Sequence, residues 1–374
     1  MKVLFPFVGD SVGGSHNSVL ELYYCLEKTN ITPIILIHNK GPLSNLLDNL
    51  QIQYVFFPVK KLAGESPNII KVFFGIFSNF FKIQKFLKIN EINIVHGNDL
   101  RINLTWSFPT RVLRRKYVWH QRTTMSNSLL WKLSYLLSDH IVAISKHVFQ
   151  SLPSNISSSK KSLVLNPFNI EIFYDKKDSR KWVNDLYSLP EKKILFGYIG
   201  RLISWKNIDT LIQYFSNFII NTNQPVHLLI VGTGSNDYVD KLKNIVIKLG
   251  LNNKVTFAGF TSEPLRVIAS FDLLISSSNN EPFGRTIIEA MIQKTPVLAA
   301  YGGGHNETII SDQTGFLYRH ESSDDFTKQC DLNINNAIQR EAMIINAHNI
   351  ACSKYSSIKH SNSILDIYKS LIAQ

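Results

Sequence analysis

Short β-rich apolar runs alternate with segments of helical period along all 374 residues of the chain. In the first half we expect strands near 3–8, 32–38, 53–57, 92–96, 117–119, 140–144 and 163–165. The pattern restarts in the second half, with strands expected at 194–199, 226–231, 255–258, 273–276, 296–299 and 315–317. The alternation predicts βαβ units with parallel strands, and the restart predicts an α/β protein of two Rossmann-like, doubly wound domains.

A shift of composition separates the two patterns. The turn 166–169 and the charged run 175–181 suit a linker. We therefore predict an N-terminal domain over residues 1–175 and a C-terminal domain over 176–357. Ligands of doubly wound sheets lie at the carboxyl ends of the strands, so a cleft between two such domains is the expected active site.

The composition indicates a globular protein, with 44% hydrophobic and 18% charged residues. The three cysteines, Cys25, Cys330 and Cys352, are odd in number and lack a metal-like spacing, which favours reduced packing residues in a cytoplasmic protein. The N-terminus lacks the apolar region of a signal peptide, and no run of 18 apolar residues occurs. We therefore expect no membrane-spanning segment.

The net charge of +12 lies almost entirely in the first half, where residues 1–170 hold 19 Lys and Arg against 8 Asp and Glu. Such a basic domain indicates an anionic partner, either nucleic acid, phospholipid headgroups or a phosphorylated acceptor. A solvated basic face without a partner is an equally good explanation of the charge alone.

The segment 69–88 is both aromatic and basic. Its expected apolar stripe is Phe73, Phe77, Phe80 and Leu87, and the lysines that could face lipid headgroups are Lys82, Lys85 and Lys88. An ordinary helix that packs on the sheet with its lysines in water is favoured over a helix that rests on a bilayer, although the two roles are compatible. Contact of residues 67–90 with the inner face of the plasma membrane is left open.

Two glutamates, Glu281 and Glu289, stand seven residues apart around a Pro-Phe-Gly turn. The turn should feed a helix that begins near Phe283, whose free N–H groups and positive dipole end suit a diphosphate. Glu281 precedes this helix and Glu289 lies one to two turns into it, so their carboxylates could be roughly 10 Å apart. This spacing matches hydroxyl groups at the two ends of a nucleotide-sugar.

Two cations and two glycine turns are expected at the same sheet edge. Arg201 and Lys206 follow the strand 194–199, where they could neutralise a diphosphate, although a solvated pair is the simpler explanation until Glu281 is considered. Turns at 232–234 and 259–261 should border a nucleotide, because glycine permits close backbone approach. Asp237 stands where a dinucleotide fingerprint needs a third glycine, which excludes a nicotinamide site.

The first half offers a glycine loop and a histidine. Gly13 and Gly14 precede a periodic helix, where such a loop either binds an anion or only makes a turn. His120 follows the strand 117–119 and is our first-domain catalytic candidate, because histidine can orient an acceptor or balance charge near neutral pH. His96 is a competing candidate at another strand end.

These motifs resemble the family-four retaining glycosyltransferases of the GT-B fold (glycosyl transferases group 1), most closely over residues 194–317. In that family the first Glu of E-x7-E contacts the donor sugar and the second contacts the ribose. A G-R-x5-K segment lines the donor pyrophosphate, with four residues instead of five between the charges here. The common G-G-x-x-E run is met by Gly303, Gly304 and Glu307, whereas His305 is atypical, and we favour a capping role for Glu307.

The resemblance implies two domains that face each other across a cleft, with the C-terminal helix 358–374 returning to the first domain. It implies these catalytic residues: His120, Arg201, Lys206 and Glu281. It implies these donor-binding residues: Gly13, Gly14, Gly259, Phe260, Thr261, Phe283, Gly284 and Glu289. No metal and no cofactor are expected, because the nucleotide diphosphate sugar is a substrate and protein cations can replace Mg²⁺ at its diphosphate.

The function expected from this resemblance is transfer of a hexose or related sugar to an acceptor hydroxyl with retention of configuration, in bacterial polysaccharide, lipopolysaccharide, capsule or glycolipid assembly. The expected partners are a nucleotide-sugar donor and a sugar or lipid-linked saccharide acceptor; nucleic acid is not expected. One alternative is a nucleotide-sugar epimerase or hydrolase of the same architecture. Another is a noncatalytic basic protein that binds membrane or nucleic acid, which leaves Glu281 and Glu289 unexplained.

Overall fold

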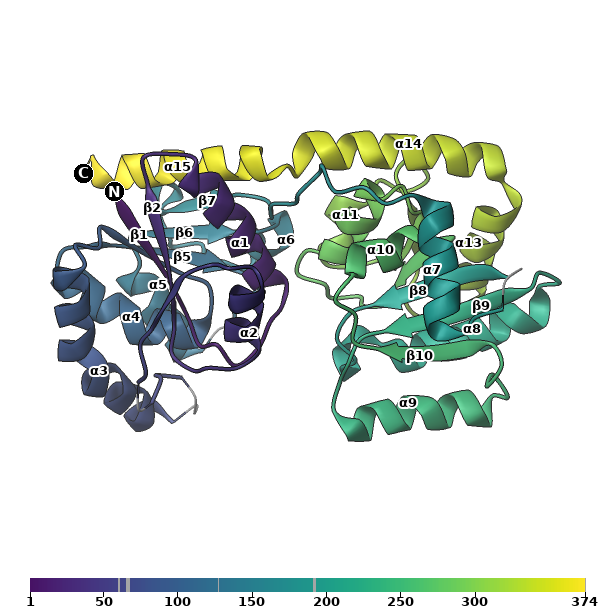
Figure 1. The fold of residues 1–374 in the computed structure, drawn as a ribbon, viewed down its shortest axis with the longest axis horizontal. Helices are drawn as coiled ribbons and strands as arrows, with labels where there is room; N and C mark the ends of the chain where they lie inside the picture. Colours follow the sequence, from purple (N-terminus) through teal and green to yellow (C-terminus); the bar gives the residue numbers. More distant parts are fainter. Residues whose placement is uncertain (60, 65–67, 127, 191–192, 374) are drawn as a thin grey trace. The chain divides into compact units, whose positions relative to one another are not determined.

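The computed structural model describes residues 1–59, 61–64, 68–126, 128–190 and 193–373, which form two compact units (Figure 1). Unit 1 comprises Met1–Asn169 together with Ser356–Gln374, and unit 2 comprises Ile170–Tyr355. The sequence analysis placed this boundary between residues 175 and 176. The structural boundary instead follows the Asn-Pro-Phe-Asn turn directly.

Unit 1 is built on a seven-stranded parallel sheet of order β3-β2-β1-β4-β5-β6-β7. Its strands are β1 (Lys2–Phe7), β2 (Thr32–Ile37), β3 (Tyr54–Phe56), β4 (Ile94–Gly97), β5 (Lys116–Gln121), β6 (His140–Ala143) and β7 (Lys161–Leu163). Its helices are α1 (Gly14–Glu27), α2 (Pro42–Asn49), α3 (Ile69–Ile89), α4 (Leu100–Val112), α5 (Leu129–Leu137), α6 (Lys146–Gln150) and α15 (Ser357–Ile372), with a 3₁₀ turn at Ser158–Lys160. The strand order reverses between β1 and β4, which is the switch point of a doubly wound sheet.

Unit 2 repeats the plan with a six-stranded parallel sheet of order β10-β9-β8-β11-β12-β13. Its strands are β8 (Ile194–Ile199), β9 (Val226–Val231), β10 (Val255–Gly259), β11 (Leu273–Ser276), β12 (Val297–Ala300) and β13 (Phe316–Tyr318). Its helices are α7 (Lys176–Tyr187), α8 (Ile208–Asn221), α9 (Asn236–Lys248), α10 (Pro264–Ala269), α11 (Arg285–Ile292), α12 (His305–Thr308), α13 (Ser323–Asn335) and α14 (Ala337–Lys354), with a 3₁₀ turn, η2, at Ser204–Lys206. Here the order reverses between β8 and β11.

Each strand expected from the sequence overlaps a strand of the structure, and the predicted α/β class is confirmed. The largest shift is at β7, which pairs with β6 through Lys161–Leu163, two residues before the predicted strand. The strands are apolar over most of their length because helices cover both faces of each sheet. The core of unit 1 includes Ile364, Tyr368 and Leu371, so α15 is an integral part of that unit.

Helix α3 buries a different face from the one that the sequence analysis expected. Val72, Ile76, Ile83 and Leu87 are buried, and α3 packs against α4. The opposite stripe, which includes Phe73 and Phe77 of the predicted set, is exposed, whereas Leu87 is buried and Phe80 packs against Phe108 with ring centroids 5.5 Å apart. The prediction that these four residues share one environment is therefore wrong, because two of them are exposed and the other two pack within unit 1. Among the helices of the described residues, none is long and apolar enough to cross a membrane.

Buried histidines are a feature of the unit 1 core. His38 accepts a hydrogen bond from Trp106 Nε1–H at Nε2 (2.9 Å), and its Nδ1–H donates to the Phe57 carbonyl (2.7 Å). Burial lowers the pKa of His38 to about 4 and lowers the pKa of His96 and of His120 well below the ordinary value. The core of unit 1 is therefore built around neutral imidazoles.

We expect the free energy of unfolding to decrease as the pH falls below about 6.5. A histidine of depressed pKa stays neutral in the folded state, while its unfolded counterpart takes up a proton near pH 6.5, so acid favours unfolding. Each such histidine should contribute a slope of up to about 1.4 kcal/mol per pH unit between pH 6.5 and its lowered pKa. Denaturant titrations at pH 7.5 and 5.5 check this. The His38→Gln variant should take up about one proton fewer on unfolding, so its free energy of unfolding should depend less on pH. Equal free energies of unfolding at both pH values would contradict the account.

Candidate active site

The switch point of unit 2 places an ion pair at the carboxyl edge of its sheet. Lys206 follows β8 in the short turn η2, and Glu281 follows β11, the neighbouring strand. Lys206 Nζ and Glu281 Oε2 form an ion pair, with only 18% and 13% of the two side chains exposed. Sequence analysis predicted both residues for the site, and the structure brings them together where open α/β sheets bind their ligands.

Neighbouring backbone fixes the position of Lys206. Asn207 adopts left-handed backbone (φ 53°) and ends the turn before α8 begins. Ser277 Oγ–H, from the loop after β11, donates to the Lys206 carbonyl at 2.7 Å. The ammonium group also lies 4.4 Å from the centroid of the Trp205 ring. The loops after β8 and β11 are thus joined by contacts besides the ion pair.

The glycine run 302–304 supports the loop that carries Glu281. Gly304 N–H donates to the Glu281 carbonyl at 2.6 Å. A Cβ atom at Gly302 would lie 2.0 Å from the Asn279 carbonyl oxygen, and one at Gly303 would lie 2.5 Å from the Glu281 carbonyl oxygen. Both glycines also have positive φ. Close backbone approach therefore requires glycine at these positions, of which only Gly303 was predicted, as part of the family's G-G-x-x-E run.

Helix α11 begins at Arg285, two residues later than predicted, and Gly284 caps it with left-handed backbone (φ 87°). Glu289 lies one turn into the helix, where Arg285 Nη2 approaches its Oε1 at 3.4 Å and 16% of each side chain is exposed. A cation in the first turn opposes the helix dipole, so this pair does little for the stability of the helix. Its effect is to orient the Glu289 carboxylate and to add positive charge beside the helix N-terminus.

Two residues near this helix are buried. Phe283, a predicted donor contact, is 2% exposed and packs against Tyr355, so the side chain supports the loop from inside. His305 is fully buried; its Nδ1–H donates to the Ala300 carbonyl (3.0 Å), and its Nε2 accepts from Ser276 Oγ–H (3.1 Å). Burial lowers the pKa of His305, so the imidazole is neutral and supports the loop that carries Glu281 through its two hydrogen bonds.

The remaining predicted residues of unit 2 line the same edge. Arg201 follows β8 and is exposed. A Cβ atom at Gly232 would lie 1.8 Å from the Gly200 carbonyl oxygen, so the loops after β8 and β9 require glycine for their close contact. At the end of β10, Gly259 has positive φ (71°) with open space where a side chain would project, and Phe260 is 77% exposed.

In unit 1, the glycine loop after β1 holds a histidine that sequence analysis missed. Gly13 N–H donates to His16 Nδ1 at 3.1 Å, in the first turn of α1 that begins at Gly14. Burial lowers the pKa of His16 to about 4, with nearby Arg122 acting in the same direction and Asp99 opposing it. The imidazole is therefore neutral, and since Nδ1 accepts, Nε2 carries the proton. The position of His16, two residues after Gly14, is the sequence feature that could have identified it as a candidate site residue.

Charged residues gather at the switch point of unit 1. Arg101, in the first turn of α4, pairs with Asp10 after β1 (2.7 Å) and with Asp99 after β4 (3.3 Å). This ion triad ties the loops after the two central strands to each other. None of the three residues was among the predicted site residues, although Asp10 and Asp99 lie in loops that follow strands, which is the signal that could have found them.

Arg122 follows β5 at the same edge of unit 1. Its Nη2 donates to Asn98 Oδ1 at 2.7 Å, and its Nη1 donates to Asn166 Oδ1 at 2.6 Å. Arg122 is half-buried, so two amide oxygens fix a guanidinium group at the end of the central strands. Arg122 was not among the residues predicted for the site.

His120 lies in the core of unit 1 and does not reach the surface. Its side chain is 0% exposed, and its Nδ1 lies 3.2 Å from His96 Nε2. The ring stacks between His96 and His360, with centroid distances of 5.3 and 5.7 Å. Helix α15 contributes His360 to this stack, and its Tyr368 hydroxyl lies 2.5 Å from His96 Nδ1. The structure thus gives His120 a packing role, and His16 is the histidine at the sheet edge.

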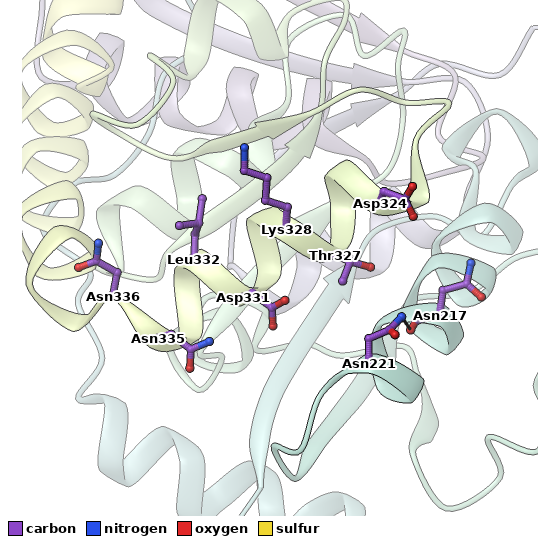
Figure 2. A pocket seen from close by; sticks show the side chains of 9 residues that line it. All are labelled: Asn217, Asn221, Asp324, Thr327, Lys328, Asp331, Leu332, Asn335 and Asn336. Atoms are coloured by element: carbon purple, nitrogen blue, oxygen red, sulfur yellow. Dashed lines mark hydrogen bonds between the residues drawn. The ribbon is translucent and has the colours of Figure 1, made fainter.

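Unit 2 also has an open groove between α8 and α13, of about 580 Å³ (Figure 2). Amide and carboxylate side chains of the two helices line it, and Asn221 Nδ2–H donates to the Asn217 carbonyl at 2.8 Å. The groove contains none of the predicted site residues. Among the residues that the structure describes, no group of three or more His, Cys, Asp and Glu side chains is placed to hold a metal ion.

Comparisons with known proteins agree with this geometry. Residues 184–350 match the family glycosyl transferases group 1. The chain is 25% identical over 310 residues to an uncharacterized glycosyltransferase of Methanocaldococcus jannaschii, covering 76% of each chain. It is 25% identical over 236 residues to the capsular polysaccharide biosynthesis glycosyltransferase CapM of Staphylococcus aureus, covering 61% of each.

The fold also matches solved structures. The crystal structure of HepE of Anabaena in complex with UDP-glucose is similar with a TM-score of 0.84 at 22% identity, covering 99% of this chain and 100% of that one. The predicted GT-B fold is thereby confirmed, and the match of residues 184–350 to glycosyl transferases group 1 agrees with the predicted group. The match to glycosyl transferases group 1 therefore covers most of unit 2, and the chain that carries it has the GT-B fold and glycosyltransferases among its relatives.

Proposed function

We propose that this glycosyltransferase moves a sugar from a nucleoside diphosphate sugar to an acceptor hydroxyl with retention of anomeric configuration. One observation carries the proposal: at the switch point of unit 2, the two glutamates of the E-x7-E motif are each held by a cation, Glu281 by Lys206 and Glu289 by Arg285. Carboxylates held in this way can accept hydrogen bonds from sugar hydroxyls without reorganisation. We assign Glu281 to the transferred sugar and Glu289 to the ribose.

The diphosphate would lie at the N-terminus of α11, between the two glutamates. The first N–H groups of this eight-residue helix and its positive dipole end favour an anion there. Lys206 and Arg201 add charge from the loop after β8. As the bond between the anomeric carbon and the phosphate oxygen breaks, negative charge grows on the departing diphosphate, and these groups would stabilise it. Gly232, Gly259 and Thr261 would border the nucleoside.

Proton transfer in this proposal uses the donor itself. The acceptor hydroxyl attacks the anomeric carbon from the face that the diphosphate leaves, and its proton passes to the departing phosphate oxygen. The new bond then forms on the same face, which gives retention. We assign no covalent nucleophile. The protein contributes placement of the reactants and electrostatic stabilisation of the leaving group.

For the acceptor side we propose the carboxyl edge of unit 1. His16 presents a neutral imidazole with a proton on Nε2, which can donate to a hydroxyl or phosphate oxygen. Arg122 provides a fixed cation at the same edge. A hydroxylated acceptor that carries a phosphate, such as a lipid-linked saccharide, fits these two groups. The similarity to CapM supports a role in surface polysaccharide assembly.

The two glutamates should affect turnover differently. Removing the charge of Glu281 in Glu281→Gln loses a charge-assisted hydrogen bond to the reacting sugar, and we expect kcat/KM to fall about 10- to 100-fold. Glu289→Gln should mainly raise the KM for the donor. Steady-state kinetics measure both, and Glu341→Gln, an exposed change on α14, is the matched control. Unchanged kcat/KM in a folded Glu281→Gln protein would remove this residue from the mechanism.

Lys206 should act on the diphosphate and not on the nucleoside. We expect Lys206→Met to lower kcat about 100-fold and to weaken binding of the nucleoside diphosphate more than that of the free nucleoside. Lys243→Met on α9 controls for loss of a surface charge. Because protein cations take this role, turnover should persist in excess EDTA. Loss of turnover in EDTA that Mg²⁺ restores would overturn this part of the proposal.

Product analysis separates the candidate functions. A panel of UDP-, GDP- and ADP-sugars, screened for thermal stabilisation and then for transfer to lipid-linked acceptors, identifies the donor, and UDP-sugars come first because the similar HepE structure holds UDP-glucose. A glycoside of retained configuration, seen by NMR, supports the proposal. An epimerised or hydrolysed donor without any glycoside indicates the alternative enzyme classes. Binding of no nucleotide-sugar contradicts all three.

A further inference from the structure

The exposed face of helix α3 is the feature of unit 1 that the catalytic proposal does not use. Five large apolar residues of this helix are exposed to solvent, with these exposed fractions: Ile70 75%, Phe73 46%, Phe74 66%, Phe77 58% and Phe81 80%. Positions 70, 74, 77 and 81 follow one another at intervals of one helical turn, so they form one continuous stripe. Single exposed apolar residues are ordinary, whereas a row of phenylalanines on one helix indicates a binding surface.

The packing of α3 keeps this stripe facing solvent. Val72, Ile76, Ile83 and Leu87 on the opposite side of α3 are buried, and α3 packs against α4 at the outside of unit 1 (Figure 1). The helix therefore cannot rotate to bury its phenylalanines without exposing an equally apolar face. We call the residues Ile70, Phe73, Phe74, Phe77 and Phe81 the aromatic face.

Charge on this helix is of one sign. From Ser66 to Asn90 the sequence holds four lysines and no acidic residue. Lys82 is exposed, but its Nζ donates to the Pro58 carbonyl and lies 4.6 Å from the centroid of the Phe57 ring, so we do not count it among the lysines that contact headgroups. Lys71, Lys85 and Lys88 are exposed beside or beyond the aromatic face.

We propose that the aromatic face inserts into the surface of an anionic lipid bilayer, with Lys71, Lys85 and Lys88 contacting the headgroups. Phenylalanines flanked by lysines are the composition of an interfacial helix. A second copy of the chain fits the surface poorly, because it would bring lysines against lysines. Protein partners in general fit it poorly as well, because lysine is depleted in their interfaces.

The placement of α3 relates this contact to the acceptor side of unit 1. The residues before α3 pack on the first two turns of α4: Ala63 N–H donates to Thr105 Oγ1 at 2.9 Å, and a Cβ atom at Gly64 would lie 3.8 Å from Arg101 Cα. Arg101 pairs with Asp10 at the carboxyl edge of the sheet. The aromatic end of α3 therefore lies at the same end of unit 1 as His16 and Arg122. A membrane-bound acceptor would approach that end.

The test is co-sedimentation of the full chain with vesicles of phosphatidylcholine alone or with roughly 30% phosphatidylglycerol. We expect binding to the anionic vesicles that is at least about tenfold stronger than to the neutral ones and that weakens with salt. The triple variant Phe74→Ser, Phe77→Ser and Phe81→Ser should lose at least about tenfold of this binding. The double variant Lys85→Glu and Lys88→Glu should lose the preference for anionic lipid.

The matched control replaces three equally exposed isoleucines of unit 2, Ile220, Ile338 and Ile345, by serine and should bind as the unchanged chain does. Circular dichroism reports whether each variant is folded, and nucleotide binding reports whether its donor site is intact. Loss of vesicle binding can therefore be distinguished from loss of the proposed activity. Vesicle binding that is absent in the unchanged chain, or unaltered in the folded triple variant, would overturn the proposal. Self-association through the aromatic face, lost in the triple variant without any vesicle binding, would overturn it as well.

Discussion

The ion pair between Lys206 and Glu281 is the contact around which the candidate site of unit 2 is arranged. It joins the loops after the two central strands, β8 and β11, at the one place in the sheet where consecutive crossovers diverge to opposite sides. The two opposite charges neutralise each other in a partly buried position, where an unpaired charge would raise the free energy of the folded state. The glycine run 302–304, His305 and Ser277 all serve to hold these two loops in place.

Much of the fold followed from the sequence because its signals are local. Strands buried on both faces must be continuously apolar, and the alternation with helices then fixes a parallel, doubly wound arrangement. The Pro-Phe-Gly turn likewise placed Glu281 before a helix and Glu289 within it, which the structure confirms to within two residues of the helix start. The close approach of Gly302 and Gly303 to the loop 279–281 was not predictable, because it joins segments some 20 residues apart through backbone contacts.

The differences from prediction arise where distant segments decide the environment of a residue. His120 lies at the end of its strand, but α15 returns from the end of the chain and stacks His360 on it. On α3, Phe77 and Leu87 belong to the same predicted stripe, and only the docking of the helix on α4 shows that Leu87 is buried and Phe77 is exposed. Arg285 and Arg122 were missed as site residues because their partners define their roles, and a partner is visible only in three dimensions.

The most direct test of the central claim is an experimental structure of the chain with a bound nucleoside diphosphate sugar. The account predicts the diphosphate at the N-terminus of α11, within hydrogen-bond or ion-pair distance of Lys206, with the ribose hydroxyls on Glu289 and the sugar hydroxyls on Glu281. A nucleotide bound in the groove between α8 and α13, or one that leaves both glutamates without contact, would contradict it.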